Sequence, residues 1–317
     1  MSDRDVGWDE YGSAKTYSTA AAAIAAASEY DNIRMFYGNN AKRPVWFQST
    51  TSTIMLSWEG MLPRRGVLLL ENTTGPNGQC PIKLDITDAK TSDVTIKNLS
   101  VGCSGVNTFD QGIQYLNASS SNTGRMNVER CSGMGLYAFV RYDSYGFGDV
   151  AYCKAIVCSR AFQQAGAYTT SQWTRFTNCG AVLCQYGFVT SAIVADVRPL
   201  LWNCYASICA NSNSGNFHAT SANNKMQDGS LEYHEGFLHQ QVRGGRDYGP
   251  AFDAEIVSAK DWVGGGAEYS GLTQDYDIDG RYIKNKQPIG PSIGVDFNGA
   301  SSSLDNTIVG TVDSSIS

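Results

Sequence analysis

The 317-residue chain lacks the marks of several large protein classes. Its longest uncharged apolar stretch, residues 20–27, is far shorter than the roughly 20 residues that span a membrane. The N-terminus, MSDRDVGWDE, is acidic and polar, whereas a secretory signal has a basic end followed by an apolar stretch. With 24 basic against 30 acidic residues and a net charge of −6, the chain offers no basic surface to nucleic acid. We therefore expect no nucleic-acid partner and no membrane insertion.

Signs of metal or cofactor chemistry are also scarce. The three histidines, His218, His234 and His239, lie apart from the nine cysteines in the sequence, and the cysteines recur as CxxxxC and not as the CxxC of zinc sites. No GxSxG, HExxH, P-loop or GxGxxG signature occurs. An odd cysteine count without a signal peptide argues against a complete disulfide framework. We expect no metal and no cofactor, and cysteines that are reduced and buried as small apolar side chains.

The cysteines mark an internal repeat. Three segments share one pattern at intervals of 26 and 25 residues: Cys153-KAIV-Cys158, Cys179-GAVL-Cys184 and Cys204-YASI-Cys209. Met126-NVER-Cys131 is interpreted as the preceding copy, with Met126 in place of the first cysteine. The second column then comprises Cys103, Cys131, Cys158, Cys184 and Cys209. Small–apolar pairs recur downstream, at Gly135-Leu136, Ala161-Phe162 and Gly187-Phe188. The sequence thus predicts a repeat architecture.

The repeating unit is built from short β-rich runs. Residues 94–101, 173–176 and 199–202 are examples, separated by Gly, Ser, Asn and Asp turns. Three strands per coil, stacked at roughly 4.8 Å, predict an all-β, single-stranded parallel β-helix. At about 26 residues per coil, the part of the chain after residue 30 would form roughly 11 coils. Both cysteines of a CxxxxC unit can point inward only if the chain bends between them.

The two ends of the chain are expected to differ. Residues 1–31 are interpreted as an N-terminal segment with a capping α-helix at about 17–31, because alanine is the best helix former and Ser18 or Thr19 suits the N-cap. Such a helix would cover the open end of a solenoid. Residues 32–317 would form the β-helix, with a less regular part from about 240. A similarity between Gly112-IQYLNASSS and Gly294-VDFNGASSS extends the repeat to the C-terminus.

These features together resemble a known superfamily. A helix of the form Tyr-Ser-Thr-x-x-x-x-Ile-x-x-Ala, then a strand, then coils rich in turn asparagines resembles the pectate-lyase-like right-handed parallel β-helix superfamily. The closest type is the bacteriophage tailspike or tail-fibre β-helix. Asp93-VTIKNLSV is similar to the strand–Asn turn–strand units of that superfamily, with Asn98, Asn178 and Asn203 each ending a strand.

The resemblance implies a virion protein that is made in the host cytoplasm. It also implies a homotrimer, other virion proteins as partners, and host surface polysaccharide as ligand. The thin rod favours a trimer independently, because it has little core per residue and side-by-side association buries apolar faces.

Candidate catalytic groups are few. The acidic, histidine and arginine strings of polygalacturonase-like β-helices are absent. A glycoside hydrolase needs two carboxyl groups about 5–9.5 Å apart. Counted from the cysteine columns, Asp143 and Asp196 lie about 12 Å apart at the backbone and form the best catalytic pair, whereas Asp149 and Asp196 lie about 16 Å apart. Solvated turn aspartates are the alternative, and Asp149 shares a register with Arg175, which predicts a structural ion pair.

Other polar and aromatic residues offer further candidates. Residues 231–247 hold a cluster around His234 that suits an acid/base site, a loop or a subunit contact. Tyr145, Phe147, Trp173 and Arg198 precede the cysteines of their coils by similar counts and are predicted to form a glycan-binding strip, since sugar rings stack on aromatic faces. Burial in the core or in a trimer interface is the alternative.

The sequence therefore favours a bacteriophage spike or tail fibre that recognises host surface glycan without strong catalysis. A polysaccharide depolymerase tailspike, acting as a glycoside hydrolase or lyase, is one alternative. A purely structural capsid decoration or head spike is another.

Overall fold

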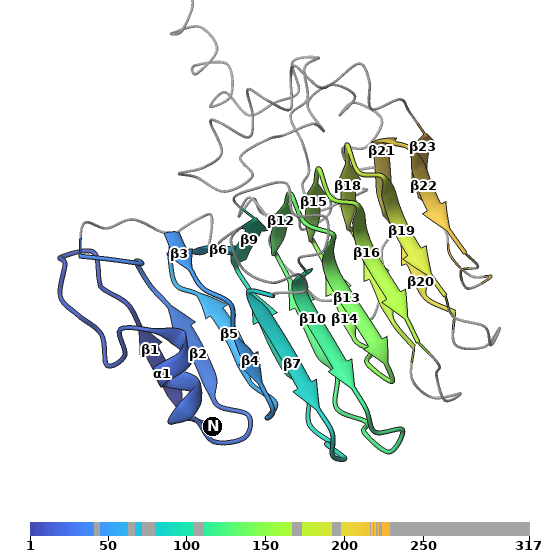
Figure 1. The fold of residues 1–317 in the computed structure, drawn as a ribbon. Coiled ribbons are helices and arrows are strands. Elements are labelled where there is room, and N and C mark those ends of the chain that lie inside the picture. Colours follow the sequence, from blue (N-terminus) through green and yellow to red (C-terminus); the bar gives the residue numbers. More distant parts are fainter. Residues whose placement is uncertain are drawn as a thin grey trace, which may run out of the picture.

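The computed structural model describes residues 1–40, 45–62, 67–71, 80–103, 111–166, 173–191, 198–215, 217, 219, 221 and 224–228. The chain passes through three parallel sheets in turn, numbered 1, 2 and 3 in chain order (Figure 1). Sheet 1 contains β1 (Asp3–Val6), β2 (Asn32–Met35), β5 (Ser57–Gly60), β8 (Val94–Lys97), β11 (Met126–Glu129), β14 (Asp149–Ala151), β17 (Arg175–Thr177) and β20 (Leu200–Trp202). Sheet 2 contains β3 (Val45–Phe47), β6 (Val67–Glu71), β9 (Leu99–Cys103), β12 (Ser132–Met134), β15 (Lys154–Ile156), β18 (Gly180–Val182), β21 (Tyr205–Cys209) and β23 (Lys225–Asp228). Sheet 3 contains β4 (Thr51–Ser52), β7 (Ile82–Ile86), β10 (Gln111–Asn117), β13 (Ala138–Ser144), β16 (Arg160–Ala165), β19 (Tyr186–Thr190) and β22 (Asn211–Ser214).

Each strand pairs in parallel with the equivalent strands of neighbouring coils, so the predicted fold class, an all-β parallel β-helix with an N-terminal helix, is confirmed. Coil length varies along the rod. Met126 pairs with Val94, 32 residues earlier, and Val150 pairs with Val128, 22 residues earlier. Leu200 pairs with Arg175 at an interval of 25. The predicted coils beyond residue 228, the less regular part and the Gly294 segment lie outside the described residues.

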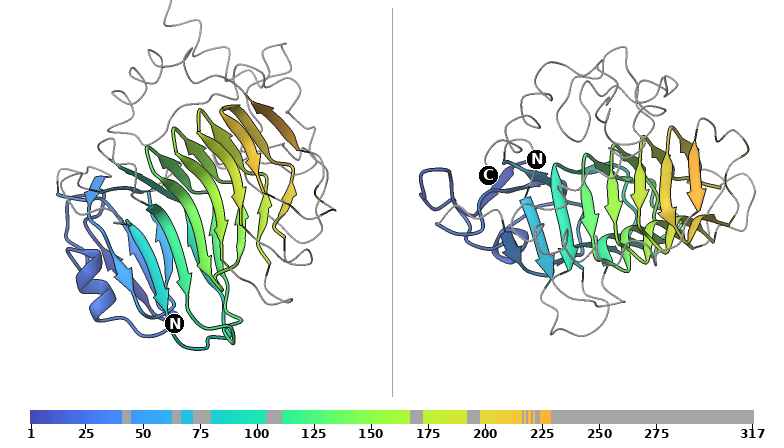
Figure 2. Two further views of the ribbon diagram at one scale, coloured as in Figure 1. Left: turned by 45° about the vertical axis from the view of Figure 1, so that its right-hand side comes forward. Right: turned by 90° about the horizontal axis from the view of Figure 1, so that it is seen from above.

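The N-terminal end contains a strand that the sequence did not reveal. The helix α1 (Ala20–Ala25) is shorter than predicted, and the Thr19 side chain caps it by accepting a hydrogen bond from the Ala22 N–H at 3.2 Å. It packs on β1 and β2 at the end of the solenoid (Figure 2). β1 precedes it and extends sheet 1 beyond β2. The sequence of β1, DRDV, has a single apolar residue, so no alternation marked it as a strand.

The bends between sheets have a common backbone geometry. Where sheet 1 leads into sheet 2, the residue after the strand has a positive φ: Asn98, Arg130, Tyr152, Asn178 and Asn203. Where sheet 2 leads into sheet 3, the same conformation occurs at Gly135, Val157 and Leu183. The residue that follows each bend points into the core. The predicted bend inside each CxxxxC unit is confirmed at Cys153–Cys158 and Cys179–Cys184, and a second bend precedes the first cysteine, with a three-residue strand between them.

The strand register corrects the cysteine columns. Ser132 pairs with Lys154, which aligns Cys131 with Cys153 and not with Cys158. The first column is therefore Leu99, Cys131, Cys153, Cys179 and Cys204. Leu136, not Cys131, precedes Cys158 in the second column, and Met126 lies in β11. The prediction was wrong because it assumed nearly equal coils, whereas this coil has only 22 residues between Val128 and Val150.

The same short coil misplaced one of the small–apolar pairs. Phe162 pairs with Phe188 as the repeat predicts, but its partner in the preceding coil is Val140, so Gly135-Leu136 is out of step.

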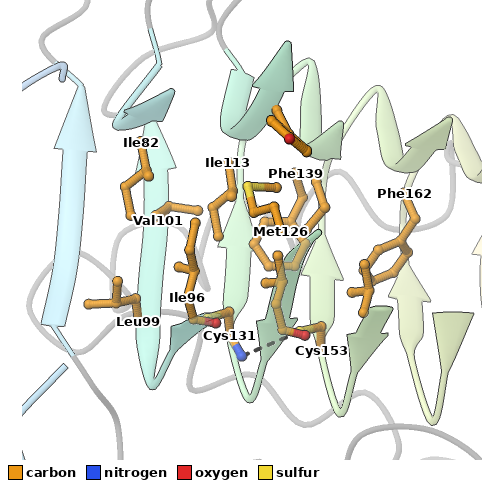
Figure 3. Packing of buried hydrophobic residues seen from close by; sticks show 14 of the residues in the cluster. Ile82, Ile96, Leu99, Val101, Ile113, Met126, Cys131, Phe139, Cys153 and Phe162 are labelled. Atoms are coloured by element: carbon orange, nitrogen blue, oxygen red, sulfur yellow. Dashed lines mark hydrogen bonds between the residues drawn. The ribbon is translucent and has the colours of Figure 1, made fainter. Parts of the chain in front are cut away.

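The core is a continuous column of apolar side chains. The Phe162 and Phe188 rings stack with centroids 5.0 Å apart, and Phe176 packs at 5.8 Å from Phe188. The thiols line the bends beside them, and the Cys131 N–H donates to Cys153 Sγ at 3.4 Å (Figure 3). The predicted burial is confirmed for Cys80, Cys131, Cys153, Cys158, Cys179, Cys184, Cys204 and Cys209. Burial raises the pKa of the Cys131, Cys153, Cys179 and Cys184 thiols well above the usual value.

Candidate functional site

The predicted glycan-binding residues lie where sheet 3 leads into sheet 1. We call this edge the 3–1 corner and define it by residues 145–148, 173–174 and 198–199. Phe147, Trp173 and Arg198 each stand two residues ahead of a sheet 1 strand. Asp149 pairs with Arg175, and Arg175 pairs with Leu200, so the three positions belong to successive coils in one register. Backbone hydrogen bonds from Arg175 N to Gly148 O, 3.1 Å, and from Leu200 N to Thr174 O, 3.0 Å, continue that register into the corner.

The members of this strip differ in exposure. Phe147 is only 5% exposed, and the Arg125 guanidinium lies 5.9 Å from its ring centroid. Tyr145, Trp173 and Arg198 are half-buried and reach solvent. Phe147 therefore supports the strip from below, while the other three residues provide its accessible surface.

The sequence missed Arg125, and the cause is the misassigned cysteine column. Phe147, Trp173 and Arg198 each precede the first cysteine of their coil by six residues. Once Cys131 is placed in that column, the same count gives Arg125. The Met126 N–H donates to Phe147 O at 3.2 Å, which places Arg125 beside Phe147. The strip thus begins one coil earlier than predicted.

Asp149 sits beside the strip and is fully engaged. Arg175 Nε lies 2.5 Å from its Oδ1, and a second guanidinium nitrogen of Arg175 pairs with Oδ2. Arg125 adds a contact to Oδ1 at 2.6 Å. The predicted Asp149–Arg175 ion pair is confirmed. Two guanidinium groups share one carboxylate, so this part of the 3–1 corner carries an excess of positive charge.

Asp143, the predicted catalytic acid, lies on the outer face of sheet 3. It alternates along β13 with the inward-facing Val140 and Tyr142. Arg141 Nε lies 2.8 Å from both of its carboxylate oxygens, and Gln114 Nε2 lies 2.6 Å from Oδ2. Both oxygens are therefore already occupied by donors within the fold. Its proposed partner Asp196 lies outside the described residues, as does the cluster around His234.

Sheet 3 adds a polar row that the sequence analysis did not single out. Gln114, Arg141 and Gln163 are cross-strand neighbours on β10, β13 and β16. Gln163 is 4% exposed, and within the described ranges its Oε1 has no hydrogen-bond partner. The outward positions of QGIQYL, AFVRYD and RAFQQA carried this signal. Gln114 and Arg141 of this row contact Asp143, which is two residues from Tyr145, so the polar row adjoins the 3–1 corner.

Neither a metal site nor a membrane span is found in the described part of the chain. Its residues form no group of three or more His, Cys, Asp or Glu that could hold a metal ion. None of its helices is long and apolar enough to cross a membrane.

Comparison with known proteins finds only structural similarities of low identity and low TM-score. No protein-family model and no curated protein sequence matches the chain. Among solved structures, the chain is similar to the deglycosylated pectin methylesterase of Aspergillus niger, with 13% identity, a TM-score of 0.27, and coverage of 73% of this chain and 91% of that one. The penultimately deglycosylated form of the same enzyme has 14% identity, a TM-score of 0.22 and coverage of 79% and 96%. The β-helix assignment rests on the strand pairing of the chain itself.

Proposed function

We propose that this protein binds an extended glycan along the 3–1 corner, as a receptor-binding spike or tail fibre of a bacteriophage would. The observation that carries the binding half is the row of half-buried Tyr145, Trp173 and Arg198 in successive coils. Coils repeat at about 4.8 Å, so such a row suits an extended chain of sugars better than a compact metabolite. Aromatic faces stack on the apolar side of a sugar ring, and a guanidinium donates to its hydroxyl groups.

The virion half of the proposal rests on different observations. The N-terminal helix followed by coils with Asn turns resembles the tailspike and tail-fibre type of β-helix. On this proposal the protein is a homotrimer, attached to other virion proteins and located in the virion. Light scattering tests the trimer, and labelling of purified particles tests the location. A stable monomer at micromolar concentration would remove the trimer from the proposal.

Binding without cleavage is favoured over the depolymerase alternative. Asp143 and Asp149 both have their carboxylate oxygens occupied by arginine or glutamine donors, so neither oxygen pair is free to exchange a proton with a substrate. We expect no release of new reducing ends when the protein is incubated with host polysaccharide. If such activity is measured and Asp143→Asn or Asp196→Asn removes it, the depolymerase alternative replaces the proposal.

Trp173→Ala tests the site directly. We expect it to weaken binding to host capsule or lipopolysaccharide about tenfold or more in isothermal titration calorimetry, since one stacked ring contributes about 0.5–1.5 kcal/mol in addition to the area it buries. Trp202→Ala is the matched control, because Trp202 lies on β20 in sheet 1, four residues beyond Arg198. Circular dichroism and the melting temperature should show an intact fold for both variants. Equal affinity of the Trp173→Ala variant and the wild type would exclude the 3–1 corner as the binding site.

A further inference from the structure

The strip at the 3–1 corner changes charge along its length. Asp93 and Arg125 precede paired residues of β8 and β11, and the Arg125 N–H donates to Asp93 Oδ1 at 2.9 Å. Phe147, Trp173 and Arg198 continue this register in the coils that follow. The row therefore begins at a carboxylate and ends at a guanidinium, with four coil steps of roughly 4.8 Å between them.

The arginines near the basic end differ in what they already bind. Arg175 forms a bidentate pair with Asp149, and Arg125 contacts the same carboxylate. These contacts fix both guanidinium groups in place and leave one positive charge in excess. The sequence adds Arg198 and one more acid, Asp196, which lies outside the described residues, so the arginines still outnumber the aspartates by three to two.

Arg198 is the arginine best placed to bind a ligand. Its Nε has no hydrogen-bond partner within the described ranges, and the side chain reaches solvent. Pro199 follows it, and a residue before proline is restricted to an extended backbone. The Leu200 N–H then donates to Thr174 O at 3.0 Å, which holds this segment against the coil of Trp173. Arg198 is thus positioned one coil step, about 4.8 Å, from Trp173.

We propose that the bound glycan carries an anionic group, a carboxylate or a phosphate, and that Arg198 binds this group while the sugar ring bearing it stacks on Trp173. This inference rests on the proposed glycan binding at the 3–1 corner. A guanidinium presents a planar fork of N–H donors that matches two oxygens of a carboxylate or phosphate. A substituent of a ring on Trp173 reaches Arg198 because neighbouring coils are only about 4.8 Å apart.

The acidic start of the strip restricts the ligand further. A uniformly anionic polymer would also place charged groups opposite Asp93, and like charges in contact weaken binding. A repeating unit with one anionic sugar among neutral sugars fits both ends of the strip. The neutral sugars would then lie toward Asp93 and the anionic sugar at Trp173 and Arg198.

Chemical removal of the anionic group tests the proposal on the unmodified, full-length protein. The probes are an array of purified bacterial capsular and O-antigen polysaccharides, some neutral and some with one anionic sugar per repeat. We expect the recognised polymers to be anionic. Carbodiimide and borohydride convert the carboxylates of such a polymer to alcohols, and hydrofluoric acid removes phosphate. In calorimetry, one of the two derivatives should bind about tenfold or more weakly, because charge-assisted hydrogen bonds are lost. The derivative that loses affinity identifies the source of the charge.

Substitution of Arg198 assigns the effect to its guanidinium. Arg198→Gln should lose about tenfold or more in affinity for the native polymer and should no longer distinguish it from the weaker derivative. Arg198→Lys keeps the charge without the planar fork, so its affinity should lie between these values. Arg160→Gln is the matched control. Arg160 is also half-buried at a bend, but it lies over the Tyr137 ring between sheets 2 and 3, so its loss should leave binding unchanged.

The outcomes separate this inference from the proposed function. If Trp173→Ala weakens binding of the native polymer and both derivatives, but the wild type binds all three equally, glycan binding stands and the anionic group is excluded. If Trp173→Ala binds all three as the wild type does, the 3–1 corner is not the site and both proposals fail. Recognition of neutral polysaccharides alone would overturn the anionic group as well. An Arg198→Gln variant that keeps the full preference for the native polymer would overturn the role of Arg198.

Discussion

The outer faces of sheets 1 and 2 differ in chemistry although the two sheets enclose the same core. On sheet 1 the outward positions of successive strands alternate in charge. Arg34 pairs with Asp5 at 2.6 Å, and Lys97 pairs with Glu59 at 3.1 Å. On sheet 2 the outward positions are buried: Ile156 and Val182 are apolar, and Lys154 is only 6% exposed. The inward residues of both sheets are apolar because they fill the shared core, whereas the outward residues reflect how exposed each face is to solvent.

The sequences of the strands show this difference between sheets 1 and 2. VTIK in β8 alternates apolar and polar residues, with Val94 and Ile96 inward. KAI in β15 and GAV in β18 are buried throughout, and the flanking residues extend them into near-continuous apolar runs. Continuous runs are typical of strands buried on both faces, and alternation is typical of strands with one wet face. The comparison therefore predicts different responses to the same kind of substitution.

The largest expected effect is on thiol reactivity. The outer faces of sheets 1 and 2 differ, but the inward cysteines at the two bends that flank sheet 2 should be equally inaccessible to reagents. Cys153 and Cys184 should react with a maleimide about a thousandfold more slowly than a free thiol, since access needs local unfolding. Burial raises the pKa of both thiols, so raising the pH from 7 to 9 should accelerate a model thiol but not these two. Mass spectrometry of the labelled native protein measures this. Prompt labelling of either residue would show that its bend is open.

Val182→Glu should have the largest effect on stability. It places a carboxylate at a buried position on the outer face of sheet 2, and we expect the free energy of unfolding to fall by about 3 kcal/mol or more. Thr95→Glu is the matched change on an outward position of sheet 1, where about 0.5 kcal/mol or less is expected. Urea unfolding followed by circular dichroism compares them. Similar losses for the two variants would remove the distinction between the buried outer positions of sheet 2 and the solvent-exposed ones of sheet 1.

Substitutions at the bends on either side of sheet 2 should change the free energy of unfolding by a smaller amount, and one of them should increase it. Asn178 and Val157 have the same positive φ, 52° and 55°, but a β-branched residue is strained there whereas asparagine tolerates it. Val157 is half-buried, so Val157→Asn should stabilise the fold by about 1 kcal/mol. Asn178→Val should destabilise it by at least as much. Chemical denaturation measures both, and a destabilised Val157→Asn variant would show that packing of the valine methyl groups outweighs the backbone strain.

The sequence was sufficient for the fold class because the β-helix repeats its signals. The short β-rich runs predicted three strands per coil, and the CxxxxC units predicted the inward cysteines and the bend between them. The sequence was insufficient for the register, because the coil between β11 and β14 is shorter than its neighbours. Cys131 was therefore assigned to the wrong column, and Arg125 was not recognised as part of the strip. The polar row on the outer face of sheet 3 is readable in the strand sequences but was not singled out, because outward polar residues are also found on any solvent-exposed face. β1 was missed because β pairing, and not its own composition, makes it a strand.

The smallest effect is expected from the charged outer face of sheet 1. Arg34 Nε lies 2.6 Å from Asp5 Oδ1, and another nitrogen of the same guanidinium lies 2.9 Å from Asp3 Oδ2, so Arg34 joins β2 to β1. The Arg34 side chain is 29% exposed, so water and salt screen these pairs. Arg34→Ala should therefore lower the free energy of unfolding by about 0.5 kcal/mol or less. The loss should shrink further in 1 M sodium chloride, where the Debye length is only about 3 Å. A loss of several kcal/mol that is insensitive to salt would show that the outer positions of sheet 1 are as buried as Ile156 and Val182 on sheet 2, and the two sheets would no longer differ.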